Sequence, residues 1–188
     1  ATGQIGWLGW REGMTADEVT PLIREALGLA REIDDSMVPL LLFVEGRIMV
    51  ASGASADLYV ERVKEALSLL DPDKEIGRAA TLNASLSQAY GWAGLLTDAL
   101  AASDAALAGA SRIDKFDHQF LGYSVDHWMK GLRGRLLARL GRFAEAEICL
   151  DEMLGIEEEL FDPTVQIIAH FGYVDFAWCR DDADLARA

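Results

Sequence analysis

Residues 134–146 read GRLLARLGRFAEA, and this stretch decides the fold. Leucine, alanine and arginine fill most of its positions, and these residues favour helix. Gly141 interrupts them, at a point where a residue without a Cβ can adopt the left-handed conformation that ends a helix. Glu145 follows four positions later and would face the positive end of the next helix dipole. The stretch therefore predicts one helix, a tight turn and a second helix.

The same arrangement recurs along the chain. Each turn glycine is preceded by a small residue seven positions earlier and followed by an acidic residue four positions later. A glycine in the middle of a helix costs up to about 1 kcal/mol relative to alanine, so its recurrence indicates close contact between two paired helices. The turn glycines are Gly13, Gly53, Gly94 and Gly141, at spacings of 40, 41 and 47; the small residues are Gly6, Gly46, Ser87 and Gly134; the acidic residues are Asp17, Asp57, Asp98 and Glu145.

This repeat predicts an all-α fold, a right-handed superhelical solenoid of antiparallel helix pairs in one repeat domain, 1–188. Helix starts are marked by Thr15 with Glu18, a capping box, and by Asp71 and Asp162, which each precede a proline. Residues 112–123, the extra length of the third spacing, are expected to form a longer surface loop. Both ends read as interrupted helices, which indicates a fragment of a longer protein. We expect helices near 15–34, 36–52, 55–70, 73–93, 95–111, 119–140, 142–160 and 163–180, in units of about 1–34, 36–70, 73–111, 119–160 and 163–188.

The composition limits the classes of partner. The net charge of −14, with a pI near 4.5, would repel both a nucleic-acid backbone and an anionic membrane face. We therefore expect no nucleic-acid partner and no membrane association. A cationic or neutral ligand, or a basic protein surface, fits this charge better, although the charge can also serve only to keep a helical array soluble.

The sequence also predicts a location. The longest apolar stretch, residues 37–44, is far shorter than the roughly 20 residues of a membrane span. No secretion leader is visible at the start. Cys149 and Cys179 sit among apolar neighbours and read as small core residues in a reducing compartment. These features predict a cytoplasmic protein.

The pattern of small residue, turn glycine and alanine resembles tetratricopeptide repeats. Ser87, Tyr90, Gly94 and Ala99 occupy the small, aromatic, turn and alanine positions of the third unit, whereas Glu18 and Leu58 stand where alanine is expected in the first two. The period of 40 or more also exceeds the usual 34 of such repeats. In the fourth unit the matching residues are Gly134, Gly141 and Ala146.

This longer form is similar to the helical arrays that follow the cyclase and AAA-type ATPase domains of large bacterial signalling proteins. The matching pieces are 9–15 (GWREGMT), 121–124 (LGYS) and 137–142 (LARLGR). Similar arrays occur in the sensor regions of maltose-regulator-like transcription activators. The resemblance implies a non-catalytic regulatory scaffold that binds a protein or peptide segment, which can be another domain of its own chain. The alternative that it leaves open is a small-ligand sensor. The catalytic residues of such proteins lie in other domains.

No catalytic pattern stands out in the sequence. There is no phosphate-binding loop of the GxxxxGK[ST] type, and Gly6, Gly9 and Gly13 read as packing and turn residues. His118 and His127 stand near acidic residues but lack the spacing of a zinc site. Ser124 with Asp126 and His127 lacks a nucleophile elbow, and adjacent helical residues point about 100° apart. We therefore expect no enzyme activity, no cofactor and no metal.

Polar residues on the first helix of each pair form the candidate ligand-binding site. In such arrays these helices line the concave face, wide enough for a peptide or a small polar molecule. A solvated surface without a ligand is the alternative. Nothing in the sequence indicates an oligomeric state. The candidates are Asn83, Lys130 and His170, eleven positions before a turn position, and Ser87, Asp126, His127, Arg133 and Tyr173, about one helical turn away.

Overall fold

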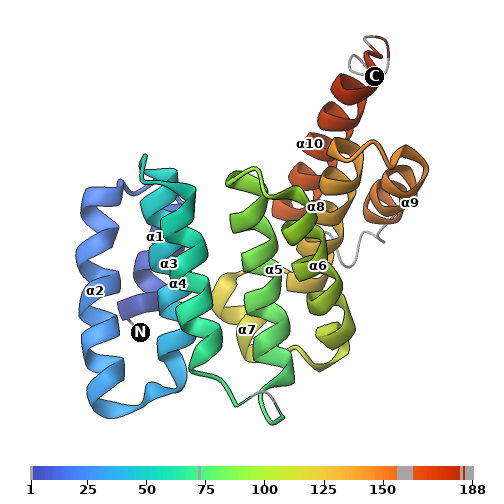
Figure 1. Ribbon diagram of the computed structural model, residues 1–188. Helices are drawn as coiled ribbons and strands as arrows, with labels where there is room; N and C mark the ends of the chain where they lie inside the picture. The colour runs from blue at the N-terminus through green and yellow to red at the C-terminus, as the bar shows by residue number, and fades with distance from the viewer. Residues whose placement is uncertain (1, 72, 156–162, 183, 185–188) are drawn as a thin grey trace.

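The computed structural model describes residues 2–71, 73–155, 163–182 and 184 of the 188-residue chain. In this part of the chain all regular structure is helical and there is no β-strand (Figure 1). The expected all-α class is confirmed. The α-helices are α1 (Thr2–Arg11), α2 (Ala16–Ile33), α3 (Val38–Ala51), α4 (Ala56–Ser68), α5 (Ile76–Trp92), α6 (Leu96–Gly109), α7 (Lys115–Leu121), α8 (Val125–Arg139), α9 (Phe143–Leu154) and α10 (Pro163–Arg180); two short 3-10 helices are η1 (Asp35–Met37) and η2 (Ala110–Arg112).

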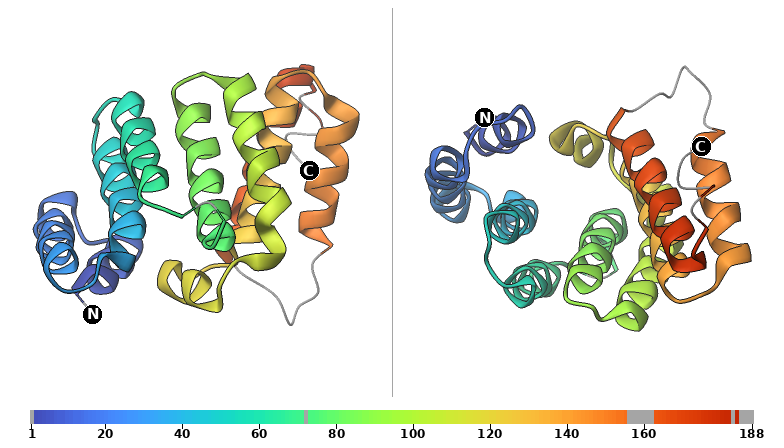
Figure 2. Two further views of the ribbon diagram at one scale, coloured as in Figure 1. Left: turned by 60° about the horizontal axis from the view of Figure 1, so that its bottom comes forward. Right: turned by 90° about the horizontal axis from the view of Figure 1, so that it is seen from above.

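Consecutive helices lie side by side and follow an arc. α1 packs against α2, α3 against α4, α5 against α6 and α8 against α9, while α10 contacts both α8 and α9. Viewed from above, the chain runs round the arc from the N-terminus to α10, with α1, α3 and α5 on its inner side (Figure 2). The short helix α7 leaves this path and lies against α1. The inner side of the arc is therefore bounded by the first helices of the pairs and by α7.

The turn glycines have the conformation that the sequence predicts. Gly13, Gly53, Gly94 and Gly141 have φ angles of 102°, 100°, 79° and 75°. At Gly141 the turn is closed by two backbone hydrogen bonds, from its N–H to the Ala138 carbonyl at 3.0 Å and from the Arg142 N–H to the Leu137 carbonyl at 2.9 Å. A side chain at such a φ is strained, which accounts for glycine at all four positions.

The small residues seven positions before these turns allow close approach of neighbouring helices, as predicted. A Cβ added to Gly46 in α3 would lie 2.9 Å from the Tyr59 ring in α4. A Cβ on Gly134 in α8 would lie 2.7 Å from the Leu150 side chain in α9. Both distances are shorter than carbon atoms normally tolerate, because optimal carbon contacts are about 3.5–4.0 Å. The glycines therefore set how closely each helix approaches the next.

Two helix starts differ in how well they were predicted. The hydrogen bond by which the Glu18 carboxylate caps the start of α2 is present, since the Thr15 N–H donates to Glu18 Oε2 at 2.7 Å. Asp71, by contrast, accepts from the Asp73 N–H at 3.1 Å and stabilises a turn, so α5 begins at Ile76 and not at 73. The expected last helix, 163–180, is confirmed as α10 (Pro163–Arg180). The capping residue Asp162, Pro72, the helix end at 156–160 and the chain end at 185–188 lie outside the described residues.

The predicted surface loop at 112–123 is wrong. Residues 115–121 form α7, in which Asp117, Phe120 and Leu121 are buried. The predicted helix 119–140 is therefore two helices, because Gly122, with φ 72°, ends α7 before α8 begins. Arg78 of α5 holds the Asp117 carboxylate through hydrogen-bonded ion contacts of 3.0 and 2.8 Å, and the Thr81 hydroxyl donates to the same carboxylate at 2.8 Å. Buried groups need such partners, and these anchor α7 to the body of the arc.

The two cysteines differ in their exposure. Cys149 is half-buried, and burial raises the pKa of its thiol. Cys179, in the last turn of α10, is exposed, so its assignment to the core is wrong. Among the described helices none combines the length and the hydropathy that crossing a bilayer requires.

Candidate functional site

The inner side of the arc contains a pocket of about 350 Å³. Side chains from five helices that are far apart in sequence meet there, which matches the size and construction of ligand pockets in general. One wall is polar and the other, from α8 and α10, is mostly apolar. The lining residues are Arg11 and Glu12 at the end of α1, Arg47 of α3, Gln88 of α5, Leu132 and Arg135 of α8, and Ile167, Ile168 and Phe171 of α10.

Arg47 is the central cation of the polar wall. Its guanidinium lies over the rings of Trp7 and Trp128, at 5.2 and 5.4 Å from their centroids. Its Nη1 also donates to the Tyr123 hydroxyl at 3.3 Å. Both tryptophans are buried, so the guanidinium is held in place by two aromatic faces. In the described part of the chain Arg47 forms no ion pair with a carboxylate.

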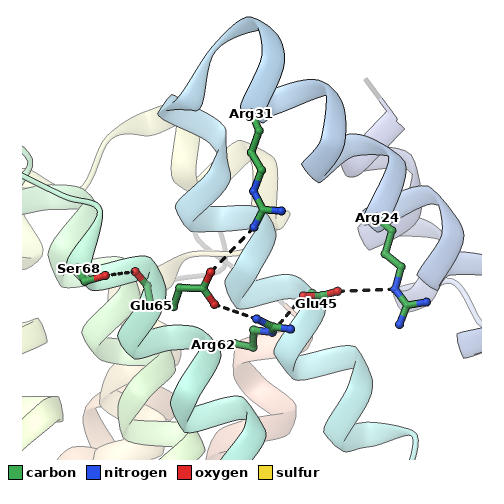
Figure 3. A network of polar contacts seen from close by, with 6 residues as sticks. All are labelled: Arg24, Arg31, Glu45, Arg62, Glu65 and Ser68. Carbon is green, nitrogen blue, oxygen red and sulfur yellow. Dashed lines mark hydrogen bonds and ion pairs between the residues drawn. The ribbon is translucent and has the colours of Figure 1, made fainter.

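Other arginines of the same region are paired with acidic residues. Figure 3 shows a network on the opposite side of α3, in which Arg62 of α4 lies 3.2 Å from Glu45 and 2.8 Å from Glu65. Arg24 of α2 lies 3.8 Å from the other oxygen of Glu45. Glu45 and Arg47 are two positions apart and so point about 200° apart round the helix. The same helix thus presents a neutralised ion network to α2 and α4 and an unneutralised cation to the pocket.

Arg11 connects the pocket to α7. Its Nη1 donates to the carbonyl oxygens of Leu121 and Gly122, at 2.9 and 2.8 Å, and its guanidinium lies 5.4 Å from the centre of the Tyr123 ring. The Trp7 indole N–H donates to the same Leu121 carbonyl at 2.9 Å. These acceptors are at the C-terminal end of α7, where helix carbonyls have no partner within the helix and attract cations. α7 is therefore fastened to α1 beside the pocket.

Gln88 and Arg135 make up the remainder of the polar wall. The Gln88 oxygen accepts from the buried Tyr59 hydroxyl at 3.4 Å, so its amino group is the part that can donate to a ligand. Arg135 Nε is held by Asp175 of α10 at 2.8 Å, and Arg139 lies 3.3 Å from the same carboxylate. Arg135 therefore contributes a cation that already has a carboxylate partner, whereas Arg47 has none among the described residues.

The polar wall follows a rule that the sequence contains. Counting back six positions from each residue of positive φ that ends a first helix gives the lining residues Arg47, Gln88 and Arg135. The same count gives Trp7 and Asp175, which lie outside the lining and contact Arg47 and Arg135. Each of these residues directly follows the small position, or its equivalent in α10, and so lies about 100° round the helix from the face that contacts the second helix. The turn periodicity was therefore the signal that could have located these residues.

Three of the sequence-predicted site residues point toward second helices and away from the pocket. Arg133 of α8 pairs with Asp104 of α6 at 2.5 Å, and Lys130 lies 3.9 Å from Glu152 of α9. The Tyr173 hydroxyl of α10 donates to Asp151 of α9. Burial first, and then this hydrogen bond, raise the pKa of Tyr173 above its usual value. Asp104, Glu152 and Asp151 are exposed and are not among the residues that line the pocket.

The other predicted residues are dispersed. Asn83 donates to the Ala79 carbonyl of its own helix at 2.8 Å, and His170 is exposed on α10. Asp126 and His127 lie together at the start of α8, with His127 Nε2 3.7 Å from the Asp126 carboxylate. Ser87 is the candidate nearest to the pocket: it is buried and lines a smaller hollow that shares Gln88, Leu132 and Arg135 with it. Their roles in binding stay predictions, but the structure does not assemble them into one surface.

The residues considered for chemistry have structural roles. His118 Nδ1 accepts the Val125 N–H at 3.1 Å and joins α7 to α8. The Ser124 hydroxyl donates to Asp126 at 2.7 Å. Burial by itself raises the pKa of Asp126, but this hydrogen bond and the nearby histidines outweigh it and leave the pKa below its usual value. Among the described residues no three of His, Cys, Asp and Glu come close enough together to hold a metal ion.

Comparison with known proteins adds no identity to this geometry. No protein-family model matches the chain, and no curated protein does. The function therefore has to be argued from the inner pocket itself.

Proposed function

We propose that this chain is a non-catalytic binding scaffold of tetratricopeptide-like helix pairs, stacked as an antiparallel solenoid, which holds a protein or peptide segment on the inner side of the arc. The observation that carries the proposal is the pocket, to which α1, α3, α5, α8 and α10 all contribute. A site that draws one helix from each unit is the arrangement that repeat arrays use for binding extended partners. Exposed apolar side chains at its edge, Ile167 and Phe171, supply anchor points for such a partner.

The resemblance to bacterial cyclase and ATPase signalling proteins supports a regulatory role for this scaffold in the cytoplasm. A partner that prefers one curvature of the arc would shift the population of that state and so act on an attached module. The complete gene tests this part directly. A cyclase or ATPase domain encoded beside residues 1–188 supports it, and a DNA-binding helix-turn-helix domain in that place contradicts it.

A small-ligand sensor of the maltose-regulator-like kind is the second candidate. The specific observation in its favour is α7, which Arg11 and Trp7 fasten beside the pocket and which makes the inner side narrower than an open groove. The pocket volume, about 350 Å³, falls within the range of small-molecule sites. A screen for small metabolites that raise the melting temperature, set beside the peptide experiment below, separates the two candidates.

The scaffold proposal is tested by selecting peptides from a random phage-displayed library on the chain and measuring their affinities by titration. Phe171→Asp places a charge on the pocket edge, and we expect it to lower the affinity for the selected peptides at least tenfold. Ile148→Asp on α9 is the matched control, because Phe171 and Ile148 are both more than half exposed, at 56% and 60%, and Ile148 is not part of the pocket. Peptides that bind both variants equally well would contradict the proposal.

A further inference from the structure

The cation Arg47 stands out against the charge of the whole chain. The sequence has 31 acidic residues and 17 basic ones, so carboxylates are abundant partners for arginine. Of the half-buried arginines, Arg62, Arg78, Arg133 and Arg135 have such a partner, and Arg11 is bound to the carbonyls of Leu121 and Gly122. In the described residues Arg47, also half-buried, has two tryptophan rings and a tyrosine hydroxyl instead. An arginine kept from carboxylates in an acidic protein is available for an anion from outside.

The neighbours of Arg47 favour an anion over any other ligand group. Arg11 lines the same pocket, and Arg135 adds a third guanidinium to the polar wall. The Gln88 amino group is a neutral donor on that wall. A guanidinium presents its donors as a planar fork that matches the two oxygens of a carboxylate or phosphate. Glu12 is the acidic residue of the lining, and it would oppose a second negative charge on the ligand.

The opposite wall selects an apolar body. Leu132, Ile168 and Phe171 face the cavity within reach of the polar wall, since all of them line the one pocket of about 350 Å³. A ligand with a charged head and an apolar or aromatic body would thus be matched at both ends. A purely polar ion would leave the apolar wall uncovered.

We propose that the inner pocket binds a small molecule that carries one anionic group, carboxylate or phosphate, on an apolar body, with the anion on Arg47. Gln88 adds a donor and Arg11 adds positive charge in the same pocket, and the body lies against Leu132, Ile168 and Phe171. The proposal rests on the second candidate function, the small-ligand sensor, and names the chemical class of its ligand. It replaces the expectation, drawn from the net charge alone, of a cationic or neutral ligand.

The experiment uses three probes of similar shape: phenylacetate, phenyl phosphate and the neutral phenylacetamide. Trp7 and Trp128 adjoin Arg47, so tryptophan fluorescence reports binding, and calorimetry gives the dissociation constants. We expect at least one of the two anions to bind at least tenfold more tightly than phenylacetamide, and its affinity to fall as salt rises. The better of the two anions identifies the head group. Equal binding of all three probes, or binding of none at millimolar concentration, overturns the proposal.

Variants locate the site. Arg47→Gln should lower the affinity for the preferred anion at least tenfold and change the affinity for the amide little. Arg47→Lys keeps the charge but loses the planar pair of donors, so its affinity for the anion should lie between those of the wild type and Arg47→Gln. Arg133→Gln is the control, because it removes an equal charge from a half-buried arginine outside the pocket. Unchanged anion affinity in folded Arg47→Gln overturns the proposal; if that variant does not fold, the comparison of acid and amide on the wild-type chain still decides. The peptide experiment with Phe171→Asp tests the scaffold proposal separately. The anion proposal can therefore fail while the scaffold proposal stands, and the reverse is also possible.

Discussion

Gly77 and Gly28 are two helix glycines for which the structure predicts opposite effects of the same substitution to alanine. A Cβ on Gly77 in α5 would lie 1.9 Å from the Arg112 carbonyl oxygen and 2.6 Å from its carbonyl carbon. These are backbone atoms at the end of η2, which cannot rotate aside as a side chain could. Gly28 in α2 has nothing within 4 Å of the corresponding position. One site is therefore closed to a methyl group and the other is open.

The magnitudes follow from two opposing terms. Alanine gains about 1 kcal/mol over glycine in a helix interior; this gain applies to Gly28 in α2 and only in part to Gly77, the second residue of α5. At Gly77 the Arg112 carbonyl must move by more than about 1 Å to restore ordinary contact, and overpacking usually costs about 1–3 kcal/mol, more when backbone has to shift. We expect Gly77→Ala to lose about 2 kcal/mol or more, and Gly28→Ala to gain up to about 1 kcal/mol.

Urea unfolding followed by circular dichroism at 222 nm measures both free energies of unfolding. In a thermal scan, about 1 kcal/mol corresponds to a shift of roughly 2–4 °C for a chain of this length. Gly77→Ala should lower the melting temperature and Gly28→Ala should raise it. If Gly77→Ala is as stable as the wild type, the close approach of α5 to the end of η2 does not exist as described, and the reasoning is refuted.

Three further predictions concern α7, a helix cap and the thiols. Asp117→Asn should destabilise the chain by about 3 kcal/mol in urea, because it leaves a largely buried arginine without its partner, and replacing both partners by Met and Leu should restore much of that loss. Hydrogen bonds from the Thr15 backbone N–H, and then from its hydroxyl, lower the pKa of Glu18 in the folded chain, so its stabilisation is full above the unfolded pKa near 4.5 and disappears as the pH falls through the lower folded value. The difference in melting temperature between wild type and Glu18→Gln should accordingly shrink from pH 6 to pH 3; a constant difference contradicts the cap. Cys179 should react rapidly with 5,5′-dithiobis(2-nitrobenzoate) and Cys149 slowly, because burial raises the pKa of the latter, and Cys179→Ala should remove the fast phase alone.

The features that the sequence predicted correctly are those set by local chemistry. A left-handed turn needs glycine wherever it occurs, so Gly13, Gly53, Gly94 and Gly141 could be recognised without knowing what surrounds them. The close contact at Gly134 follows in the same way, since only a small residue fits against a neighbouring helix. Both depend on one residue and its immediate neighbours.

α7 was missed because its stability comes from distant residues. Seven residues are too few for a helix to stand alone or to show a clear apolar period. Its partners, Arg78 and Arg11, lie 39 and more than a hundred positions away from the residues that they bind. No pattern within residues 112–123 reveals them.

The sequence-predicted site residues and the pocket residues differ by a rotation of the helix. Ser87, Arg133 and His170 are among the predicted residues, whereas Gln88, Arg135 and Phe171 line the pocket, one or two positions further on. Each position turns a side chain by about 100°, so a shift of one or two positions exchanges the inner side for another face. The net charge predicts a cationic or neutral ligand, but a sum over the chain does not say which charges face a cavity.

The bond between the Trp7 indole and the Leu121 carbonyl also has a consequence for the order in which the chain can fold. In a simple linear array each unit is complete once its neighbour exists, so folding can follow synthesis from the ribosome step by step. Here the Trp7 indole of α1 gains its hydrogen-bond acceptor only when residues more than a hundred positions downstream have been synthesised and have folded. Such long-range closure slows folding, and we expect a nascent chain that stops before residue 115 to leave the Trp7 side of α1 exposed to solvent and to chaperones.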